Sequence, residues 1–151
     1  MKFKTEICED GDEEVVIRCK KITKEIEALQ LAIKNTINNQ AHDLVLYKDG
    51  AEFYLPLESI LFFETGRSSV NAHTKDDEFQ VKYKLYELEN MLPGYFMRVS
   101  KSTIININQI YSINYNIASS SRVDFYNTHK KIFVSRMYYK PLKEKMKGRY
   151  Q

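Results

Sequence analysis

The spacing of apolar residues changes once along this chain, near residue 44, from a helical period to a period of two. Before that point, Thr23 can cap a helix over residues 23–38, in which apolar residues recur at helical intervals: Ile22, Ile26, Leu29, Ile33 and Ile37. Residues 3–8 and 14–20 are expected as strands on either side of an acidic turn. We therefore expect residues 1–42 to form a β-β-α extension, with the apolar stripe packed on this chain's own sheet rather than forming a dimer seam.

From residue 44 onward, short apolar runs are separated by turn residues. Asp49-Gly50 stands between the runs 44–47 and 52–55, which is a strong hairpin signal. A basic helix should begin near Ser135, and Pro141 must either open this helix or kink it. Many short strands with few helices predict a mainly β fold, of the β-dominated α+β class, over residues 43–151. Its remaining elements are a short helix over 84–92 and strands at 60–63, 69–74, 78–82, 107–115, 122–127 and 131–135.

The net charge of +3 hides an asymmetry between the two parts of the chain. Residues 1–100 contain 13 Lys/Arg and 18 Asp/Glu, whereas residues 101–151 contain 10 and 2. A basic segment attracts polyanions, although basic helices are also often just solvated surfaces. No apolar run is long enough for a membrane span or a signal peptide, so a cytoplasmic location is expected.

Catalytic chemistry finds no support in the sequence. The two cysteines, Cys8 and Cys19, and the three scattered histidines are spaced unlike the ligands of a metal site. The motifs of serine hydrolases, zinc proteases and phosphate-binding loops are missing, and no receiver-type phosphoacceptor aspartate is apparent. We therefore expect a protein that is not an enzyme and that needs neither a metal nor a cofactor.

One run of residues in the second half of the chain resembles a known sequence motif and therefore points to a specific function. Phe96-Met97-Arg98-Val99-Ser100-Lys101-Ser102-Thr103-Ile104-Ile105-Asn106 resembles the signature of LytTR DNA-binding domains. Segments 60–64, 85–89 and 134–136 fall into register with further motifs of that family. Two departures concern base preference: Ser100 stands where the family usually has His, and Met137 follows Arg136 where a basic residue is common.

The resemblance implies a standalone LytTR transcription regulator, without a receiver domain, that binds duplex DNA. In this family loops, rather than a recognition helix, enter the major groove. Three patches that face DNA carry over to this chain as Arg67, Ser68 and Ser69; Ser100, Lys101 and Ser102; and Arg136 with Lys140 as a phosphate contact. The resemblance also implies binding as a homodimer or at tandem sites on DNA, and a small membrane protein as a regulatory partner.

The residues alone leave other functions open. The basic tail could dock on an acidic protein or a membrane surface, and the aromatic residues could stack the bases of RNA or single-stranded DNA. Arg136 could instead pair with an acid at the start of a helix. We expect Arg98 to pair with a carboxylate such as Glu64, and Asn106 to satisfy backbone groups rather than touch DNA.

Overall fold

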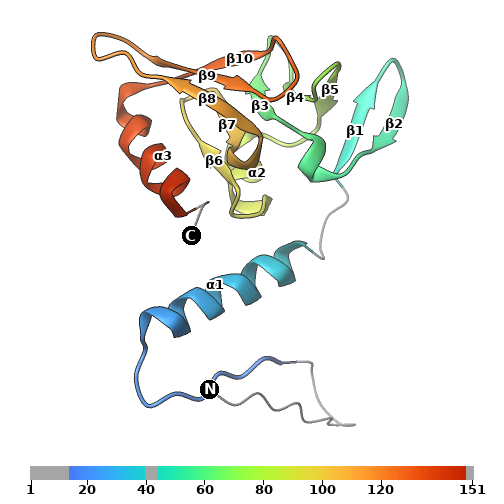
Figure 1. Cartoon of the computed structure of the whole chain (residues 1–151). Helices are drawn as coiled ribbons and strands as arrows, with labels where there is room; N and C mark the ends of the chain where they lie inside the picture. Colours follow the sequence, from blue (N-terminus) through green and yellow to red (C-terminus); the bar gives the residue numbers. More distant parts are fainter. Residues whose placement is uncertain (1–13, 40–43, 149–151) are drawn as a thin grey trace.

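The computed structural model describes residues 14–39 and 44–148, and Figure 1 shows their arrangement. Within these residues, ten strands form two sheets, one with the order β2-β1-β5-β4-β3-β7-β6 and the other with the order β10-β9-β8. All neighbouring strands are antiparallel, so the mainly β class expected from the sequence is confirmed. The elements are α1 Lys24–Asn39, β1 Val45–Lys48, β2 Ala51–Tyr54, η1 Leu57–Ser59, β3 Phe62–Thr65, β4 Val70–His73, β5 Glu78–Val81, α2 Leu85–Met91, β6 Phe96–Arg98, β7 Thr103–Asn106, η2 Ile107–Gln109, β8 Ile110–Asn114, β9 Ser121–Phe125, β10 Lys131–Val134 and α3 Arg136–Gly148.

The hairpin of β1 and β2 forms as the sequence predicts. Lys48 pairs with Ala51, which leaves Asp49 and Gly50 as a two-residue turn. Both turn residues have positive φ, 51° and 77°, as a type I′ turn requires. Glycine and aspartate tolerate this backbone region, so the Asp-Gly pair fixes the register of the hairpin.

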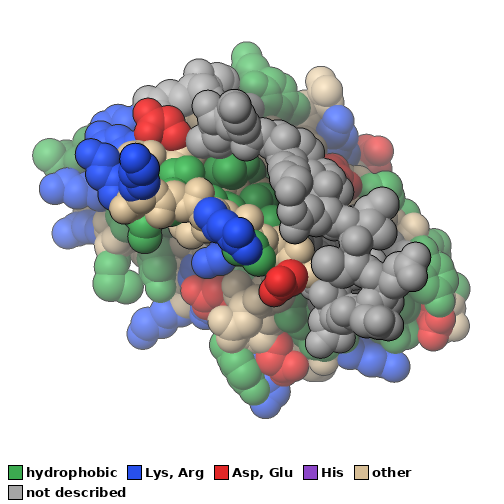
Figure 2. All heavy atoms as spheres, turned by 90° about the horizontal axis from the view of Figure 1, so that it is seen from below, with side chains coloured by type: hydrophobic (Ala, Val, Ile, Leu, Met, Phe, Trp, Pro, Cys, Tyr) green, Lys and Arg blue, Asp and Glu red, His purple; other side chains and the backbone are tan. Residues whose placement is uncertain are grey.

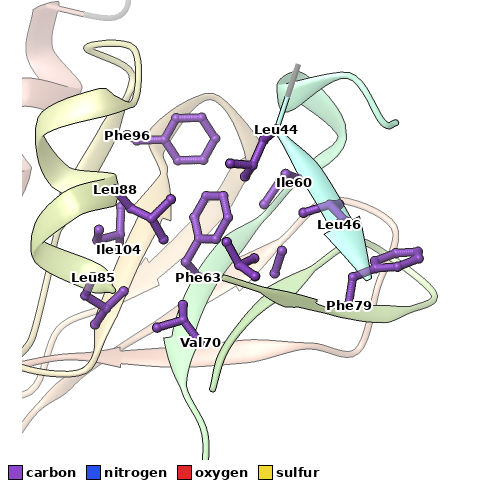
Figure 3. Packing of buried hydrophobic residues seen from close by; sticks show 12 residues of the cluster. Leu44, Leu46, Ile60, Phe63, Val70, Phe79, Leu85, Leu88, Phe96 and Ile104 are labelled. Carbon is purple, nitrogen blue, oxygen red and sulfur yellow. The ribbon is translucent and has the colours of Figure 1, made fainter. Parts of the chain in front are cut away.

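Side-chain alternation along the central strands divides the core into two layers. Phe63 and Ile104 lie opposite each other and face the first layer, under α2, where Figure 3 shows Phe63 among Phe96, Leu88 and Ile104. Phe62 and Ile105 are paired likewise and face the second layer, which the three-stranded sheet and α3 cover. Because both faces are covered, all four residues of β7 are buried. A strand buried on both faces loses the period of two, so periodicity does not predict β7.

The two later helices are anchored by buried leucines. Leu85 and Leu88 attach α2 to the first core layer, and Leu142, fully buried, attaches α3 to the second. Pro141 lies inside α3 rather than at its first turn, so the alternative in which it opens the helix is wrong. Its ring nitrogen cannot donate to the Met137 carbonyl, and the burial of the adjacent Leu142 offsets that loss.

The extension departs from expectation in its first part. Thr23 caps α1 as predicted, because its Oγ1 accepts a hydrogen bond from the Ile26 amide at 3.4 Å. Residues 14–19, however, have no regular secondary structure, so the strand expected at 14–20 is wrong. No described strand supplies backbone partners to this segment, and Val15 and Val16 remain largely exposed. The strand expected at 3–8 lies outside the described residues.

The apolar stripe of α1 does not pack on the sheets. Ile26 is buried, but Ile22 is 65% exposed and Leu29 37% exposed. Figure 1 shows α1 below the two sheets, and among the described elements it makes no extended contact with another helix or strand. The expectation that this stripe is buried on the chain's own sheet is therefore wrong for the residues that the structure describes.

Candidate nucleic-acid interface

The loop between β3 and β4 carries the first of the three expected patches. Thr65 pairs with Val70, and the Gly66 amide donates to the Ser69 carbonyl at 2.8 Å, which closes the loop. A Cβ at Gly66 would lie 2.9 Å from Nδ2 of Asn71, so only glycine fits this tight turn without displacement. Arg67 and Ser68 are exposed at the tip, whereas the Ser69 hydroxyl donates to Asn71 at 3.1 Å.

The loop between β6 and β7 carries the second patch. Its base is closed by the Val99 amide, which donates to the Thr103 carbonyl at 3.0 Å. The Ser100 hydroxyl accepts a hydrogen bond from the Ser102 amide at 3.2 Å, which shapes the turn. Lys101 and Ser102 are exposed, and Ser100 is half-buried. This loop therefore projects a lysine between two serines.

Arg98 holds the β6–β7 loop from behind. Its Nε donates to the Ser100 carbonyl at 2.7 Å, its Nη2 donates to the Lys101 carbonyl, and its Nη1 contacts Oε2 of Glu89 on α2 at 3.1 Å. The expectation that Arg98 pairs with a carboxylate is confirmed, but the partner is Glu89 and not Glu64. The register explains why: Arg98 lies opposite Ile104, which lies opposite Phe63, so the side chain of the next residue, Glu64, points to the other face of the sheet.

The start of α3 carries the third patch. The Ser135 amide donates to the Val99 carbonyl at 3.0 Å, so α3 begins directly beside the β6–β7 loop. Arg136 is exposed, and its Nη2 donates to the Ala118 carbonyl at 2.7 Å rather than pairing with an acid. Lys140, also exposed, follows one helical turn later.

Backbone hydrogen bonds join the three patches into one strip. The Thr65 amide donates to the Ser102 carbonyl at 2.9 Å, and the Ser135 amide donates to the Val99 carbonyl. The β6–β7 loop thus lies between the β3–β4 loop and the start of α3. We call this surface the loop strip; it consists of Arg67, Ser68, Ser69, Ser100, Lys101, Ser102, Arg136 and Lys140, of which only Ser69 and Ser100 are half-buried and the rest exposed.

Two basic residues beside the loop strip were not expected from the sequence. Lys82 and Lys84, both exposed, follow β5 and line an open groove together with Arg67, Ser68 and Ser69. The Lys82 ammonium lies 4.3 Å from the centroid of the Tyr47 ring, a cation–π contact that orients it. The sequence Lys82-Tyr83-Lys84 matches no DNA-binding motif. Only the antiparallel pairing of β4 and β5, in which Val81 lies opposite Val70, shows that these lysines lie beside the β3–β4 loop.

On the face that Figure 2 shows, most of the visible positive charge lies toward one side. Figure 2 shows Lys and Arg side chains gathered on the left, the side on which Figure 1 places α3 and the start of α1. The last turn of α3 carries Lys145 and Lys147, and burial lowers the pKa of Lys145. Cations at the end of a helix also interact favourably with its dipole.

His73 and Asn106 have structural roles. The His73 ring stacks on Phe62 at 4.3 Å, and burial lowers its pKa, opposed by the charge of Glu78. The Asn106 side chain donates to the Ile60 carbonyl at 2.9 Å and accepts from the Asn108 amide at 3.0 Å, so the expectation that it satisfies backbone groups is confirmed. Neither residue belongs to the loop strip.

Residues 14–39 and 44–148 contain neither a cluster of metal ligands nor a helix that could span a membrane. No group of three or more His, Cys, Asp or Glu side chains lies close enough together to hold a metal ion. Among the helices of the same residues, none is both long and apolar enough to cross a membrane.

A family model described as the LytTr DNA-binding domain matches residues 51–147. The chain belongs to this family. Two curated relatives come from Staphylococcus aureus, strains bovine RF122 / ET3-1 and NCTC 8325 / PS 47. Each is 32% identical over 117 residues, which cover 76% of this chain and 79% of the relative, and each is described as an uncharacterized HTH-type transcriptional regulator.

A solved structure shows the same LytTR fold. It is the LytTr DNA-binding domain of a methyl-accepting/DNA response regulator from Bacillus cereus, with a TM-score of 0.63 and 22% identity over 69% of this chain and 96% of that one. In the described part of this LytTR chain, five strands separate α1 from α2 and five more separate α2 from α3. Successive helices therefore do not form a helix-turn-helix pair, in which two helices are joined by a short turn.

Proposed function

We propose that this LytTR chain is a transcription regulator that binds duplex DNA sequence-specifically and reads the major groove mainly through loops. The observation that carries the proposal is the loop strip, in which two backbone hydrogen bonds hold three polar segments from distant parts of the chain side by side. Family membership supports DNA as the ligand, and the relatives described as transcriptional regulators support the regulatory role.

Each side chain of the loop strip suits a different kind of contact. Arg136 can donate two hydrogen bonds to O6 and N7 of a guanine, which is the commonest base-specific contact in the major groove. Lys101 can reach a guanine or a phosphate, and the serines can reach base edges or phosphates. Lys140, with Lys82 and Lys84 at the other end of the strip, can neutralise phosphates and so position the duplex.

The composition of the loop strip favours duplex DNA over single strands. Proteins that bind single strands stack bases on exposed aromatic rings. The loop strip contains no aromatic side chain: five phenylalanines are core residues, and exposed aromatic residues such as Tyr54, Tyr86 and Tyr111 lie outside the strip.

The test is selection of bound duplexes from a random pool, followed by competition. We expect one enriched sequence, bound about a thousandfold or more tightly than unrelated duplex. Neither strand of that sequence alone, nor the corresponding RNA, should compete comparably. Failure to enrich any sequence, or equal competition by a single strand, would contradict the proposal.

Two partners implied by the family also remain proposals. We propose that copies bind as a homodimer or at tandem sites on one DNA molecule, and that a small membrane protein regulates the chain. The exposed apolar side chains of α1, outside the matched residues 51–147, are the surface that we assign to protein contacts. Sedimentation with duplexes that carry one or two selected sites measures how many copies bind one DNA molecule. Co-purification from membranes, with and without residues 1–42, tests the contact with a membrane protein.

A further inference from the structure

The hairpin that joins β8 to β9 ends in an uncharged tip beside α3. Its residues 115–120 read Tyr-Asn-Ile-Ala-Ser-Ser, so the tip brings no negative charge near a polyanion. Figure 1 shows this hairpin reaching out past the start of α3. Neither the expected patches nor the proposed contacts include it.

The tip is held in one shape by its own polar side chains. The Ala118 amide donates to Oδ1 of Asn116 at 3.0 Å, which is an Asx turn. The Asn116 amide in turn donates to Oγ of Ser121 at 3.3 Å, and Ser121 is buried. Ile117, between these anchored positions, is 81% exposed, the highest value among the large apolar side chains of the described residues.

Two contacts connect the tip to the first turns of α3. The Tyr115 ring packs on the Tyr139 ring with 4.6 Å between centroids. Nη2 of Arg136 donates to the Ala118 carbonyl at 2.7 Å. Contacts thus run from the β3–β4 loop to the β6–β7 loop, from the β6–β7 loop to α3, and from α3 to the hairpin tip. The tip therefore extends the loop strip at the Arg136 end.

We propose that the β8–β9 tip is a fourth DNA-contacting segment with two tasks. The Ala118 carbonyl orients the Arg136 guanidinium before DNA arrives, which makes the tip a positioning element for this arginine. Ile117 contacts the duplex beyond Arg136, where an aliphatic side chain suits a thymine methyl group, and the hydroxyls of Ser119 and Ser120 suit phosphates. This inference rests on the proposed duplex-binding function.

An uncharged contact has a distinctive salt dependence. Only groups that neutralise phosphates release counterions, so loss of Ile117 should lower affinity and leave the salt slope unchanged. Loss of a phosphate contact, such as the one proposed for Lys140, should change both. The two kinds of contact can therefore be told apart on the same duplex.

Two variants of the full chain test the proposal on the selected duplex. Ile117→Ser removes the apolar contact, and we expect an affinity loss of about tenfold with an unchanged salt slope. The second variant replaces residues 116–120 by Asn-Gly, which suits the two-residue turn that would join Tyr115 to Ser121 in the existing register. It keeps the Tyr115 ring and removes the Ala118 carbonyl. We expect it to lose protection at one end of a hydroxyl-radical footprint and to relax base preference where Arg136→Ala also relaxes it.

The controls separate this inference from the function on which it rests. Tyr54→Ser, at a 64% exposed position on β2 outside the loop strip, should bind like the unaltered chain. If the unaltered chain selects no duplex, the proposed function fails. If it binds and Lys101→Ala weakens it, but Ile117→Ser binds equally well with the same footprint, the proposed Ile117 contact is overturned. If the shortened variant keeps its base preference at the Arg136 position, the positioning task is overturned. If that variant does not fold, Ile117→Ser and Ile117→Ala decide whether the tip contacts DNA. In that case Ala118→Pro, which changes the backbone at the carbonyl that holds Arg136, decides the positioning task.

Discussion

The backbone amide of Ser135 donates a hydrogen bond of 3.0 Å to the carbonyl oxygen of Val99. Val99 is fully buried, and its own amide donates to the Thr103 carbonyl. The β6–β7 loop and the start of α3 are therefore joined through main-chain atoms and a core side chain. Consequently the relative position of Lys101 and Arg136 does not depend on either side chain, and each can be changed without changing the fold.

Replacing either of these residues with alanine should weaken DNA binding. We expect Arg136→Ala to cost about 1–3 kcal/mol of binding free energy and to relax preference at one base position. Lys101→Ala should weaken binding and, if its contact is to phosphate, flatten the salt slope by about one unit. Titration of the selected duplex at several salt concentrations measures both effects.

Lys75→Ala is the matched control for the lysine. Lys75 is exposed in the turn between β4 and β5, at the opposite end of β4 from the β3–β4 loop. Its removal should change neither affinity nor salt slope. If Lys101→Ala and Arg136→Ala both bind like Lys75→Ala, the assignment of the loop strip is wrong.

Arg98→Ala should reduce both stability and DNA affinity, because it removes the donors that hold two carbonyls of the β6–β7 loop. We expect a loss of about 1–3 kcal/mol in the free energy of unfolding, measured by urea titration. Glu89→Gln removes only the partly exposed ion pair and should cost less than about 1 kcal/mol. Equal losses in the two variants would show that the ion pair, and not the bonds to the loop, is what matters.

Gly66→Ala should distort the β3–β4 loop. The added Cβ would lie 2.9 Å from Asn71 Nδ2 and 3.1 Å from the Ser69 carbonyl oxygen, so the loop must shift. We expect a destabilisation of about 1–3 kcal/mol and weaker DNA binding. Gly148→Ala, where nothing lies within 4 Å, is the control and should unfold at the same urea concentration as the unaltered chain. A Gly66→Ala variant with unaltered stability and affinity would contradict the close approach.

His73 should make stability depend on pH in the mildly acidic range. Burial lowers its pKa in the folded chain below the usual 6.5, so the unfolded chain binds the proton more readily. Its contribution is present above about pH 6.5 and is lost as the pH falls from there through the lowered folded pKa. We expect the unaltered chain to lose more stability between about pH 7.5 and pH 5.5 than His73→Gln does. Urea titrations at both pH values measure this, with the exposed His129 changed to Gln as the control; identical pH dependence in the unaltered chain and His73→Gln would refute it.

Removing residues 1–42 should leave DNA preference unchanged. The matched family residues begin at 51, and α1 makes no extended contact with the described strands or with the other two helices. We expect residues 43–151 to select the same duplex and to differ in self-association or solubility, measured by sedimentation. A folded, monomeric fragment that selects a different sequence would show that the extension takes part in recognition.

Local patterns in the sequence determined much of the fold. Asp49-Gly50 specifies its hairpin because few residue pairs adopt two positive φ angles at low cost, and Thr23 specifies the start of α1 because its hydroxyl satisfies an amide that the helix leaves unpaired. The signature around Ser100 to Ser102 indicated the family, and the resemblance to that family pointed to the residues of the loop strip. These features depend on residues within a few positions of each other, so a short segment of sequence is enough to predict each one.

The tertiary structure decided which distant residues meet. Arg98 pairs with Glu89 and not Glu64 because strand register, which a shift of one residue reverses, sets the face on which each side chain projects. The strand expected at 14–20 does not form, because period-two spacing predicts a strand but cannot supply the partner that a strand needs. The contacts of Ser135 with Val99 and of Arg136 with Ala118 involve main-chain carbonyls, which every residue carries. Such contacts cannot be predicted from the residue types. Only the packing of the two sheets and α3 brings the donor and the acceptor of each contact together.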